Sequence, residues 1–307
     1  MEKTLNLKDH RLVKKRNKKL NGGVRGKWIV SISAFIIIGL TLAITIFLTI
    51  KGLQSFIKNG LSPIEFLTSL EWNPTSKDDP SFGALPFIFG SFAVTFLSAL
   101  IAAPLGIGGA IFMTEIAPKW GRKFLRPAIE LLVGIPSVVY GFIGLTLLVP
   151  FIREHVGGLG FSLLSGTIVL SIMILPTVTS IATDAMSSLP NSLREGSYAL
   201  GATRWQTIRK VLIPAAFPSL LTAVVLGMAR AFGEALAVQM VIGNVRNFPE
   251  SIIDPAATLT TIITLNMGHT TYGSLENNSL WSLGLILLMM SFIFILVIRY
   301  LSSRRKV

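Results

Sequence analysis

The chain has 307 residues, of which 51% are hydrophobic and 14% are charged, and its formal net charge is +13. Apolar runs of about 20 residues recur along it, which indicates an integral membrane protein and excludes an ordinary soluble domain. The absence of cysteine excludes disulfides and thiolate metal sites, and the three histidines are far apart in sequence, so no metal site is predicted.

A basic arm, residues 1–27, precedes the first apolar run. The arm holds ten lysine and arginine residues, and the run at 28–50 is long enough to cross a bilayer. A cleaved signal peptide would have a shorter apolar core followed by small residues, whereas this run continues into Lys51. We therefore predict an uncleaved first span that the arm orients, with binding of anionic lipid or RNA as the alternative role of the arm.

Five further apolar runs predict five more spans, so the expected fold is an all-α integral membrane protein with six transmembrane helices. The last five spans form a core over residues 85–301. The runs lie at 85–114, 128–151, 161–183, 215–243 and 280–300.

The lysines and arginines predict the orientation of these spans. Four stretches hold 22 of the 28 basic residues: 1–27, 115–127, 184–214 and 299–307. By the positive-inside rule these stretches are cytoplasmic, as are both termini. The net charge therefore follows the topology and does not indicate nucleic-acid binding. The external stretches hold eight acidic and five basic residues, so the outer face would not attract an anionic solute by itself.

Glycine and proline interrupt three of the predicted spans. The interruptions are "APLGIGGA" at 103–110, "GIPSVVYG" at 134–141, and Pro176. Such residues permit close packing of membrane helices. Repeated prolines also suit helices that line a cavity, where the freed carbonyls can find partners. The sequence leaves both interpretations open.

The external stretch 244–279 separates the last two spans. Its segment "AATLTTIITLNMG" is too short to cross a bilayer and too apolar for a plain loop. We expect a surface-lying or re-entrant helix there.

A polar segment, "PNSLREGSYALGATRWQTIRKVLIP", separates the fourth and fifth spans at 190–214 and is called the elbow below. Ser192 and Glu195 have the spacing of a capping box, which predicts the start of a short helix. This helix would run through Leu200 and stop at Gly201, because glycine tolerates the left-handed closing conformation.

The second half of the elbow repeats this signal. Thr203 and Gln206 predict a second capping box, and Pro214 should limit the helix that follows. The elbow could lie on lipid with its basic residues reaching the headgroups, or it could insert into a groove of a cytosolic partner. Three small residues of the first helix would permit close approach of such a partner: Gly196, Ser197 and Ala199.

Two charged residues, Arg230 and Glu234, fall near the middle of the fifth predicted span. Each costs about 2.5–3.5 kcal/mol at the centre of a membrane helix. Their spacing predicts one shared helix face, although arginine before glutamate is the weaker order for support of the helix. They could play a structural role only, as an ion pair or through hydrogen bonds to neighbouring helices. Alternatively they could face a pathway, where Arg230 grips an oxyanion and Glu234 holds Arg230 when substrate is absent.

Three further acidic residues at predicted cytosolic span ends are expected to anchor loops. They are Glu115, Glu130 and Asp184.

The pattern Glu195–x5–Gly201–x9–Val211-x-Ile213-Pro214 resembles the "EAA" loop of permease subunits of ATP-binding cassette (ABC) importers. Small residues replace the two alanines of that consensus. The resemblance implies a type I, MetI-like permease core with an added N-terminal span. It also implies that the elbow is the coupling helix that docks on an ATPase subunit, through Glu195, Gly196, Ser197, Ala199, Gly201 and Pro214.

Four longer segments resemble the PstC-type subunit of phosphate importers: "FGALPFIFGS", "PLGIGGAIFMTEIAP", "ELLVGIPSVVYGF" and "RAFGEALAVQMVIGN". The resemblance covers residues 61–300. The sister PstA-type subunit usually reads G-E-T-A-P where this chain has the sequence from Gly233 to Ala237, which favours PstC. Arg230 and Glu234 correspond to an arginine and a glutamate that this family uses in transport.

The resemblance implies three partners: a PstA-like sister permease, a homodimeric PstB-like ATPase and an extracytoplasmic PstS-like phosphate-binding protein. All would act at the plasma membrane of a prokaryote. The chain has no G-x-x-x-x-G-K-[ST] motif, so ATP and Mg²⁺ are expected on the ATPase, and this chain is expected to bind no cofactor and to be no enzyme.

Other functions stay open. The chain could carry sulfate, molybdate or tungstate, or it could be the sister subunit. A more distant alternative is an ion-coupled secondary transporter that uses Glu234 for proton coupling. The sequence shows no inverted repeat, which weighs against that alternative.

Overall fold

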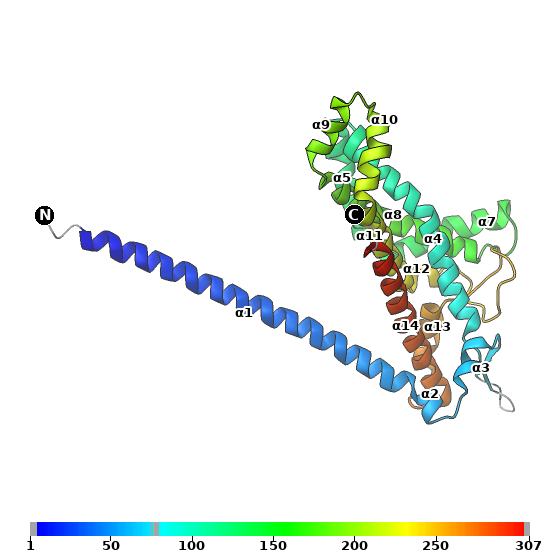
Figure 1. The fold of residues 1–307 in the computed structure, drawn as a ribbon. Helices are drawn as coiled ribbons and strands as arrows, with labels where there is room; N and C mark the ends of the chain where they lie inside the picture. The colour runs from blue at the N-terminus through cyan, green and yellow to red at the C-terminus, as the bar shows by residue number, and fades with distance from the viewer. Residues whose placement is uncertain (1–4, 75, 77–79, 304–307) are drawn as a thin grey trace. The chain divides into compact units, whose positions relative to one another are not determined.

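The structure is a computed structural model that describes the backbone of residues 5–74, 76 and 80–303 (Figure 1). The chain divides into two compact units, residues 1–51 and 52–307. The helix of the first unit, α1 (Leu5–Gly52), contains both the first apolar run and the basic arm from Leu5 onward.

The described residues contain six helices long and apolar enough to cross a membrane, which confirms the predicted number of spans. Several are built from consecutive helical pieces. The spans are Lys27–Ile57, Leu85–Ile116, Ser137–His155, Leu163–Ser187, Arg204–Phe232 and Leu275–Leu296.

A small lobe that the sequence did not predict precedes the second span. Its two short strands pair antiparallel, with Trp72 opposite Phe82. The Trp72 ring contacts Phe66, Phe82 and Phe87 edge to face, the arrangement that aromatic quadrupoles favour. The elements of the lobe are α2 (Gln54–Ile57), α3 (Pro63–Thr68), β1 (Trp72–Asn73) and β2 (Ser81–Phe82).

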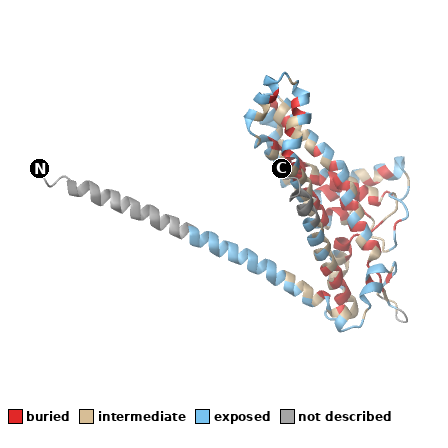
Figure 2. Ribbon diagram, in the orientation of Figure 1, coloured by how far each residue is buried: buried red, intermediate tan, exposed pale blue. Residues whose placement is uncertain are grey.

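Two long helices, α4 (Leu85–Ile111) and α8 (Leu163–Ser187), pack closely through glycine. A β-carbon on Gly106 would lie 2.9 Å from Val178 Cγ1, which is too close for any side chain. Pro104 lies within α4 without ending it, and Pro176 is buried in α8. The packing interpretation therefore holds for Gly106 and Pro176, whereas Pro104 is exposed and does not pack against α8 in this way. Figure 2 shows that buried residues gather where α4 and α8 meet α11.

The third span begins later than predicted. Residues 119–134 form a separate helix, α5 (Lys119–Gly134), and the span starts at Ser137, so the prediction of one run at 128–151 was wrong. The reason is Pro136, which disfavours helical backbone at the residue before it; Ile135 is extended, with φ −67° and ψ 129°. The span consists of α6 (Ser137–Ile143), the π-helical turn η2 (Gly144–Leu148) and α7 (Val149–His155).

The fifth span ends earlier than the predicted 215–243, because its helix stops at Phe232 with Gly233 as the C-cap. Glycine costs about 1 kcal/mol in a helix interior, so a break there is favoured. The elements of the elbow and the fifth span are α9 (Asn191–Ala199), α10 (Arg204–Thr207), the π-helical turn η3 (Ile208–Leu212) and α11 (Ile213–Phe232).

A short helix, α13 (Leu259–Asn266), confirms the helix expected in the stretch 244–279. Its first turn is buried, and the Leu259 amide donates to Ser91 Oγ on α4 at 2.9 Å. The helix therefore packs inside the second unit and does not lie on its surface. The neighbouring elements are α12 (Leu236–Gln239), the 3-10 turn η4 (Met267–His269) and α14 (Leu275–Ser303), and the second span ends in the π-helical turn η1 (Phe112–Ile116).

The packing of α4 on α8 can be tested with two glycines of the same helix. Gly106→Val should lower the free energy of unfolding by about 1–3 kcal/mol, because its methyl groups would overlap Val178. Gly108→Val is the control, because a β-carbon there meets nothing within 4 Å. Thermal unfolding in detergent measures both, and equal melting temperatures would contradict the packing assignment.

Candidate functional site

The first helix of the elbow, α9, ends as the sequence predicts. Gly201 has a φ of +79°, a left-handed conformation that glycine adopts without strain. The Gly201 amide donates to the Tyr198 carbonyl at 2.9 Å and the Ala202 amide to the Ser197 carbonyl at 3.2 Å. These bonds satisfy carbonyls at the end of α9. The two helices of the elbow therefore meet at a fixed corner.

The start of α9 differs from the prediction. The helix begins at Asn191, and Pro190, with extended backbone, occupies the N-cap position without a side-chain hydrogen bond. Ser192 consequently lies inside the first turn, where its hydroxyl cannot cap the helix. The predicted capping box of Ser192 and Glu195 was wrong, because the local signal ignored the proline two residues earlier.

The second half of the elbow contains the predicted capping box. The Thr203 amide donates to Gln206 Oε1 at 2.9 Å, and the Gln206 amide donates to Thr203 Oγ1 at 3.3 Å. The helix does not end at Pro214, however. Residues 204–232 form one continuous helical span, in which the π-helical turn η3 precedes Pro214. Pro214 lies in the first turn of α11, where a missing amide costs little.

A buried hydroxyl pair joins the two halves of the elbow. Ser197 Oγ lies 2.9 Å from Thr207 Oγ1, and both residues are buried. Thr207 also donates to the Thr203 carbonyl at 3.1 Å. Of the residues predicted to dock a partner, Ser197 is therefore buried and hydrogen-bonded inside the elbow and is not available at its surface. The other five lie at the surface: Glu195, Gly196, Ala199, Gly201 and Pro214.

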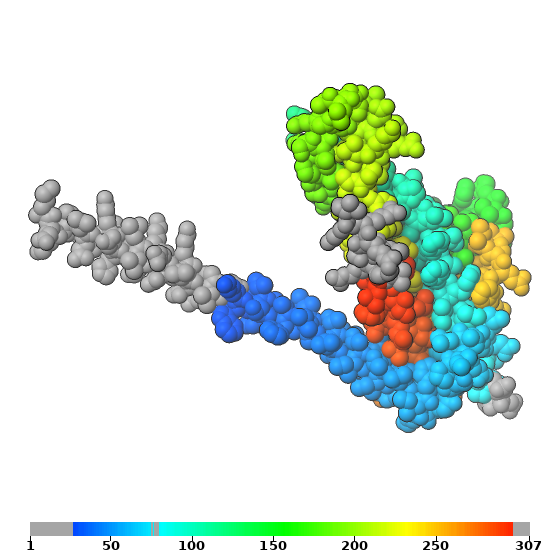
Figure 3. Space-filling view, in the orientation of Figure 1, coloured from blue at the N-terminus to red at the C-terminus, as the bar shows by residue number. Residues whose placement is uncertain are grey.

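The elbow projects from one end of the second unit as a rounded knob, green to yellow-green in Figure 3. Large apolar side chains lie exposed on it, among them Leu200 at 90% and Trp205 at 60%. The lobe with α3 lies at the opposite end of the unit (Figure 1). A projecting knob with exposed apolar side chains is better shaped for insertion into a groove of a partner than for lying flat on a lipid surface.

The three acidic residues expected to anchor loops all contact arginines. Arg126 Nε lies 3.1 Å from Glu130 Oε1, and Arg126 Nη2 lies 3.4 Å from Asp184 Oδ1. Glu115 Oε1 lies 2.6 Å from Arg194 Nη2. The hydrogen bond that Arg194 donates to Glu115 raises the pKa of Arg194 above its ordinary value. Sequence reasoning found the acids but missed Arg194, because its partner is far away in the chain.

Arg230 and Glu234 do not share a helix face, which corrects the prediction drawn from their spacing. Arg230 lies near the end of α11, whereas Glu234 lies beyond the break at Gly233. Among the ion pairs of the described residues, none joins them. Arg230 Nη1 instead donates to Thr177 Oγ1 on α8 at 2.9 Å. The guanidinium is thus attached to the close-packed pair of long helices.

Glu234 organises the chain after the break. Its Oε1 accepts from the Ala237 amide at 3.1 Å, at the start of α12. Its main-chain carbonyl accepts from Thr260 Oγ1 on α13 at 2.9 Å. A cavity of about 10 Å³ lies beside it, with room for about one water-sized molecule. Buried hydroxyls line that cavity: Ser91, Thr95, Thr258 and Thr260.

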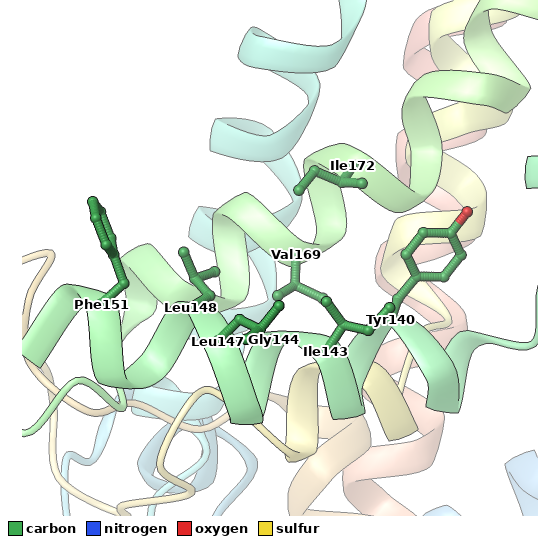
Figure 4. Close-up of a pocket in the computed structure, with 8 residues that line it drawn as sticks. All are labelled: Tyr140, Ile143, Gly144, Leu147, Leu148, Phe151, Val169 and Ile172. Carbon is green, nitrogen blue, oxygen red and sulfur yellow. The ribbon is translucent and has the colours of Figure 1, made fainter.

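A second cavity, of about 400 Å³, lies along the third span and α8 (Figure 4). The Tyr140 hydroxyl at one end donates to the Leu132 carbonyl at 2.9 Å. No charged residue lines this cavity, so it offers no site for an anion. Its lining is Tyr140, Ile143, Gly144, Leu147, Leu148, Phe151, Val169 and Ile172.

Comparison with known proteins supports this architecture. The family model described as the inner membrane component of binding-protein-dependent transport systems matches residues 106–307. The chain is 76% identical to the probable ABC transporter permease protein YqgH of Bacillus subtilis, over 97% of this chain and 96% of that protein. It is 39% identical to the phosphate transport system permease protein PstC of Mesorhizobium japonicum, over 78% of each chain.

Solved structures with the same fold are less similar in sequence. A bacterial ABC transporter for the import of the acidic polysaccharide alginate aligns with a TM-score of 0.64 and 17% identity, over 94% of this chain and all of that one. The MetNI methionine ABC transporter in an inward-facing conformation aligns with a TM-score of 0.56 and 20% identity, over 71% and 94%. Together with its six spans, these matches show that the chain belongs to the family of inner membrane components of binding-protein-dependent transport systems, the permease subunits of ABC importers.

Proposed function

We propose that this chain is the PstC-type permease subunit of an ATP-driven importer of inorganic phosphate. The main support for the proposal is the position of Arg230, whose guanidinium lies in a membrane span and is hydrogen-bonded to Thr177 on α8. The relatives of the chain also include proteins named as phosphate permeases. Arg230 lies in the last turn of this span and not near its middle, where the sequence predicted it. A cation within an apolar membrane helix is still costly, so it calls for a function.

The chemistry of Arg230 suits a tetrahedral oxyanion. A guanidinium carries five N–H donors and stays charged at every physiological pH. Thr177 accepts from one nitrogen, Nη1, and Arg230 is only half-buried, so other donors can reach a passing phosphate. Parallel hydrogen bonds to two oxygens would give orientation as well as attraction.

Glu234 would then have two roles, one in fixing the backbone next to the pathway and one in weakening the binding of the anion. It connects α12 with α13 just after the break at Gly233, so it fixes the backbone that adjoins the hydroxyl-lined cavity. Its negative charge near the pathway would weaken the binding of an anion, which keeps the substrate releasable. The cavity of about 10 Å³ is too small for phosphate, so passage requires the helices around it to move apart.

That movement would come from alternating access driven by a separate motor. Two PstB-like ATPase subunits would bind ATP and Mg²⁺ and would grip the elbows of this chain and a PstA-like sister. A PstS-like binding protein would deliver phosphate to the outer face, whose acidic excess gives no attraction of its own. This arrangement places the elbow and both termini on the cytoplasmic side of a prokaryotic plasma membrane, in keeping with the distribution of basic residues.

Substitution of Arg230 tests the pathway. Arg230→Gln should lower phosphate uptake by about tenfold or more, because a hydrogen bond to a charged group is worth about 1.5–3 kcal/mol. Uptake of labelled phosphate by proteoliposomes containing the whole complex measures this. Arg153→Gln, at an exposed external arginine, is the control. Normal uptake by an assembled Arg230→Gln complex would remove Arg230 from the pathway.

Substitution of Thr177 tests how the guanidinium is held. Thr177→Val keeps the shape of the side chain but removes the acceptor of Arg230 Nη1. We expect a raised KM for phosphate with a smaller loss of maximal uptake than in Arg230→Gln, because the charge remains while its orientation is lost. Uptake measured against phosphate concentration separates the two effects. An unchanged KM would show that Thr177 does not orient the guanidinium.

The choice of substrate and of energy source can be tested in the same vesicles. Phosphate should accumulate only with ATP and the binding protein present, and excess sulfate or molybdate should not compete. Competition by either anion would assign a different oxyanion. Accumulation driven by an ion gradient without the ATPase would instead support secondary transport.

A further inference from the structure

Arg194 and Glu115 form a partly buried ion pair between the elbow and the end of α4. Arg194 lies on α9, and its side chain is 19% exposed; that of Glu115, in η1 at the end of α4, is 7% exposed. Arg194 Nη2 donates to Glu115 Oε1 at 2.6 Å, and Nε lies 3.3 Å from each carboxylate oxygen. The guanidinium therefore holds the carboxylate through two nitrogens, a geometry that fixes both direction and distance.

The same guanidinium also binds the end of α8. Arg194 Nη2 donates to the Met186 carbonyl at 3.3 Å, and Nη1 donates to the Leu189 carbonyl at 3.2 Å. The last carbonyls of a helix lack partners within the helix, and a cation near them is favourable. A single side chain of α9 thus joins three elements: α9 itself, the end of α8 and the end of α4.

This pair differs from the other ion pairs of the described residues. Arg126 with Glu130 and with Asp184 has side chains that are 59–66% exposed. Exposed pairs are screened by salt and hold their partners loosely. The pair of Arg194 and Glu115 is less exposed, so salt screens it less and it holds its partners more firmly.

The pair matters because α4 is remote from the elbow in sequence. The elbow is continuous with α8 on one side and with α11 on the other. Among the described residues, the hydrogen bonds between α9 and the second span all run between Arg194 and Glu115. At its other end α4 carries Ser91, which accepts from the Leu259 amide of α13, the helix bonded to the Glu234 carbonyl through Thr260.

The elbow and α4 also share an apolar cluster, in which Ile208 and Leu212 of the elbow lie with Ala110 of α4. We infer that the pair of Arg194 and Glu115 is the polar link that, beside this apolar cluster, passes a displacement of the elbow to α4, and through α4 to the surroundings of Glu234. Arg194 is a positioning residue in this scheme and touches no substrate. The inference rests on the proposed function in one respect, namely that an ATPase moves the elbow.

The first test measures coupling. Complexes carrying Arg194→Met, Arg194→Lys or Glu115→Gln are reconstituted with the other subunits, and phosphate transported per ATP hydrolysed is compared with the wild type. Arg194→Met should lower this ratio by about tenfold, a typical size for coupling between sites, while ATP hydrolysis continues. Arg194→Lys, which keeps the charge, should lower it less. Arg126→Met, which breaks only exposed pairs, is the control and should leave the ratio unchanged.

A second measurement follows the contact directly and does not depend on phosphate. The chain has no cysteine, so Ser192→Cys on α9 and Ile116→Cys in η1, both exposed, give one specific pair of spin labels. The distance between them should stay narrow in the nucleotide-free and vanadate-trapped complexes. It should broaden in Arg194→Met and in Glu115→Gln, and stay narrow in Arg126→Met.

The two measurements separate the possible failures. A wild-type complex that hydrolyses ATP without moving phosphate would contradict the proposed substrate, while the label distances would still test the contact. Unchanged transport per ATP together with unchanged label distances would overturn the inference. If Arg194→Met does not assemble, Glu115→Gln and Arg194→Lys decide the matter by the same criteria.

Discussion

The close packing of α4 on α8 is the contact on which the other features depend. Glycine at 106 removes the side chain that would hold the helices apart, so Val178 fits against the α4 backbone. Membrane helices gain little from burial of apolar surface, because lipid is equally apolar, and they associate instead through such close contacts. Thr177 lies beside Val178 on α8, and Glu115 lies just beyond the end of α4. The geometry of both Arg230 and Arg194 is therefore set by this one packed pair.

The second determinant is the interruption of the chain after α11. A span that continued through Gly233 would have carried Glu234 onto the face of Arg230, and two opposite charges would have neutralised each other. The break separates them, so Arg230 bonds to Thr177 while Glu234 accepts from the Ala237 amide at the start of α12. A guanidinium bonded to one hydroxyl keeps donors for an anion, which a salt bridge would have occupied. The short helices after Gly233 thus contribute to the site as much as the long spans do.

Much of this architecture could be predicted from the sequence, because its signals are local. Apolar runs gave the six spans, Gly201 gave the corner of the elbow, and Thr203 with Gln206 gave its second capping box. The incorrect predictions arose where a nearby residue, in most cases a proline, overrode a pattern that is otherwise reliable. Pro136 cut a long apolar run, and Pro190 displaced Ser192 from its cap. Pro214 failed to stop a helix because the preceding π-helical turn accommodates it.

The candidate site was the least predictable part, because it depends on pairs far apart in sequence. Arg230 was identified from the free-energy cost of a charge in a membrane helix. Its partner Thr177 lies 53 residues away, and nothing in the sequence near either residue indicates that they pair. Arg194 and Glu115 are 79 residues apart, and a basic residue in a polar loop gives no signal of burial. Spacing rules apply within one helix, whereas these contacts are decided by which helices pack together.

The helix is continuous from Arg204 in the elbow to Phe232, so a rotation of the elbow would also displace the far end of this helix. At 1.5 Å per residue, the 26 residues between Arg204 and Arg230 span roughly 40 Å. A tilt of about 5° at the elbow would then swing the guanidinium sideways by about 3 Å, the length of one hydrogen bond. A small angular change at the elbow is thus enough to part Arg230 from Thr177. In the proposed transporter, this separation would alter the hydrogen bonds that Arg230 offers to an anion.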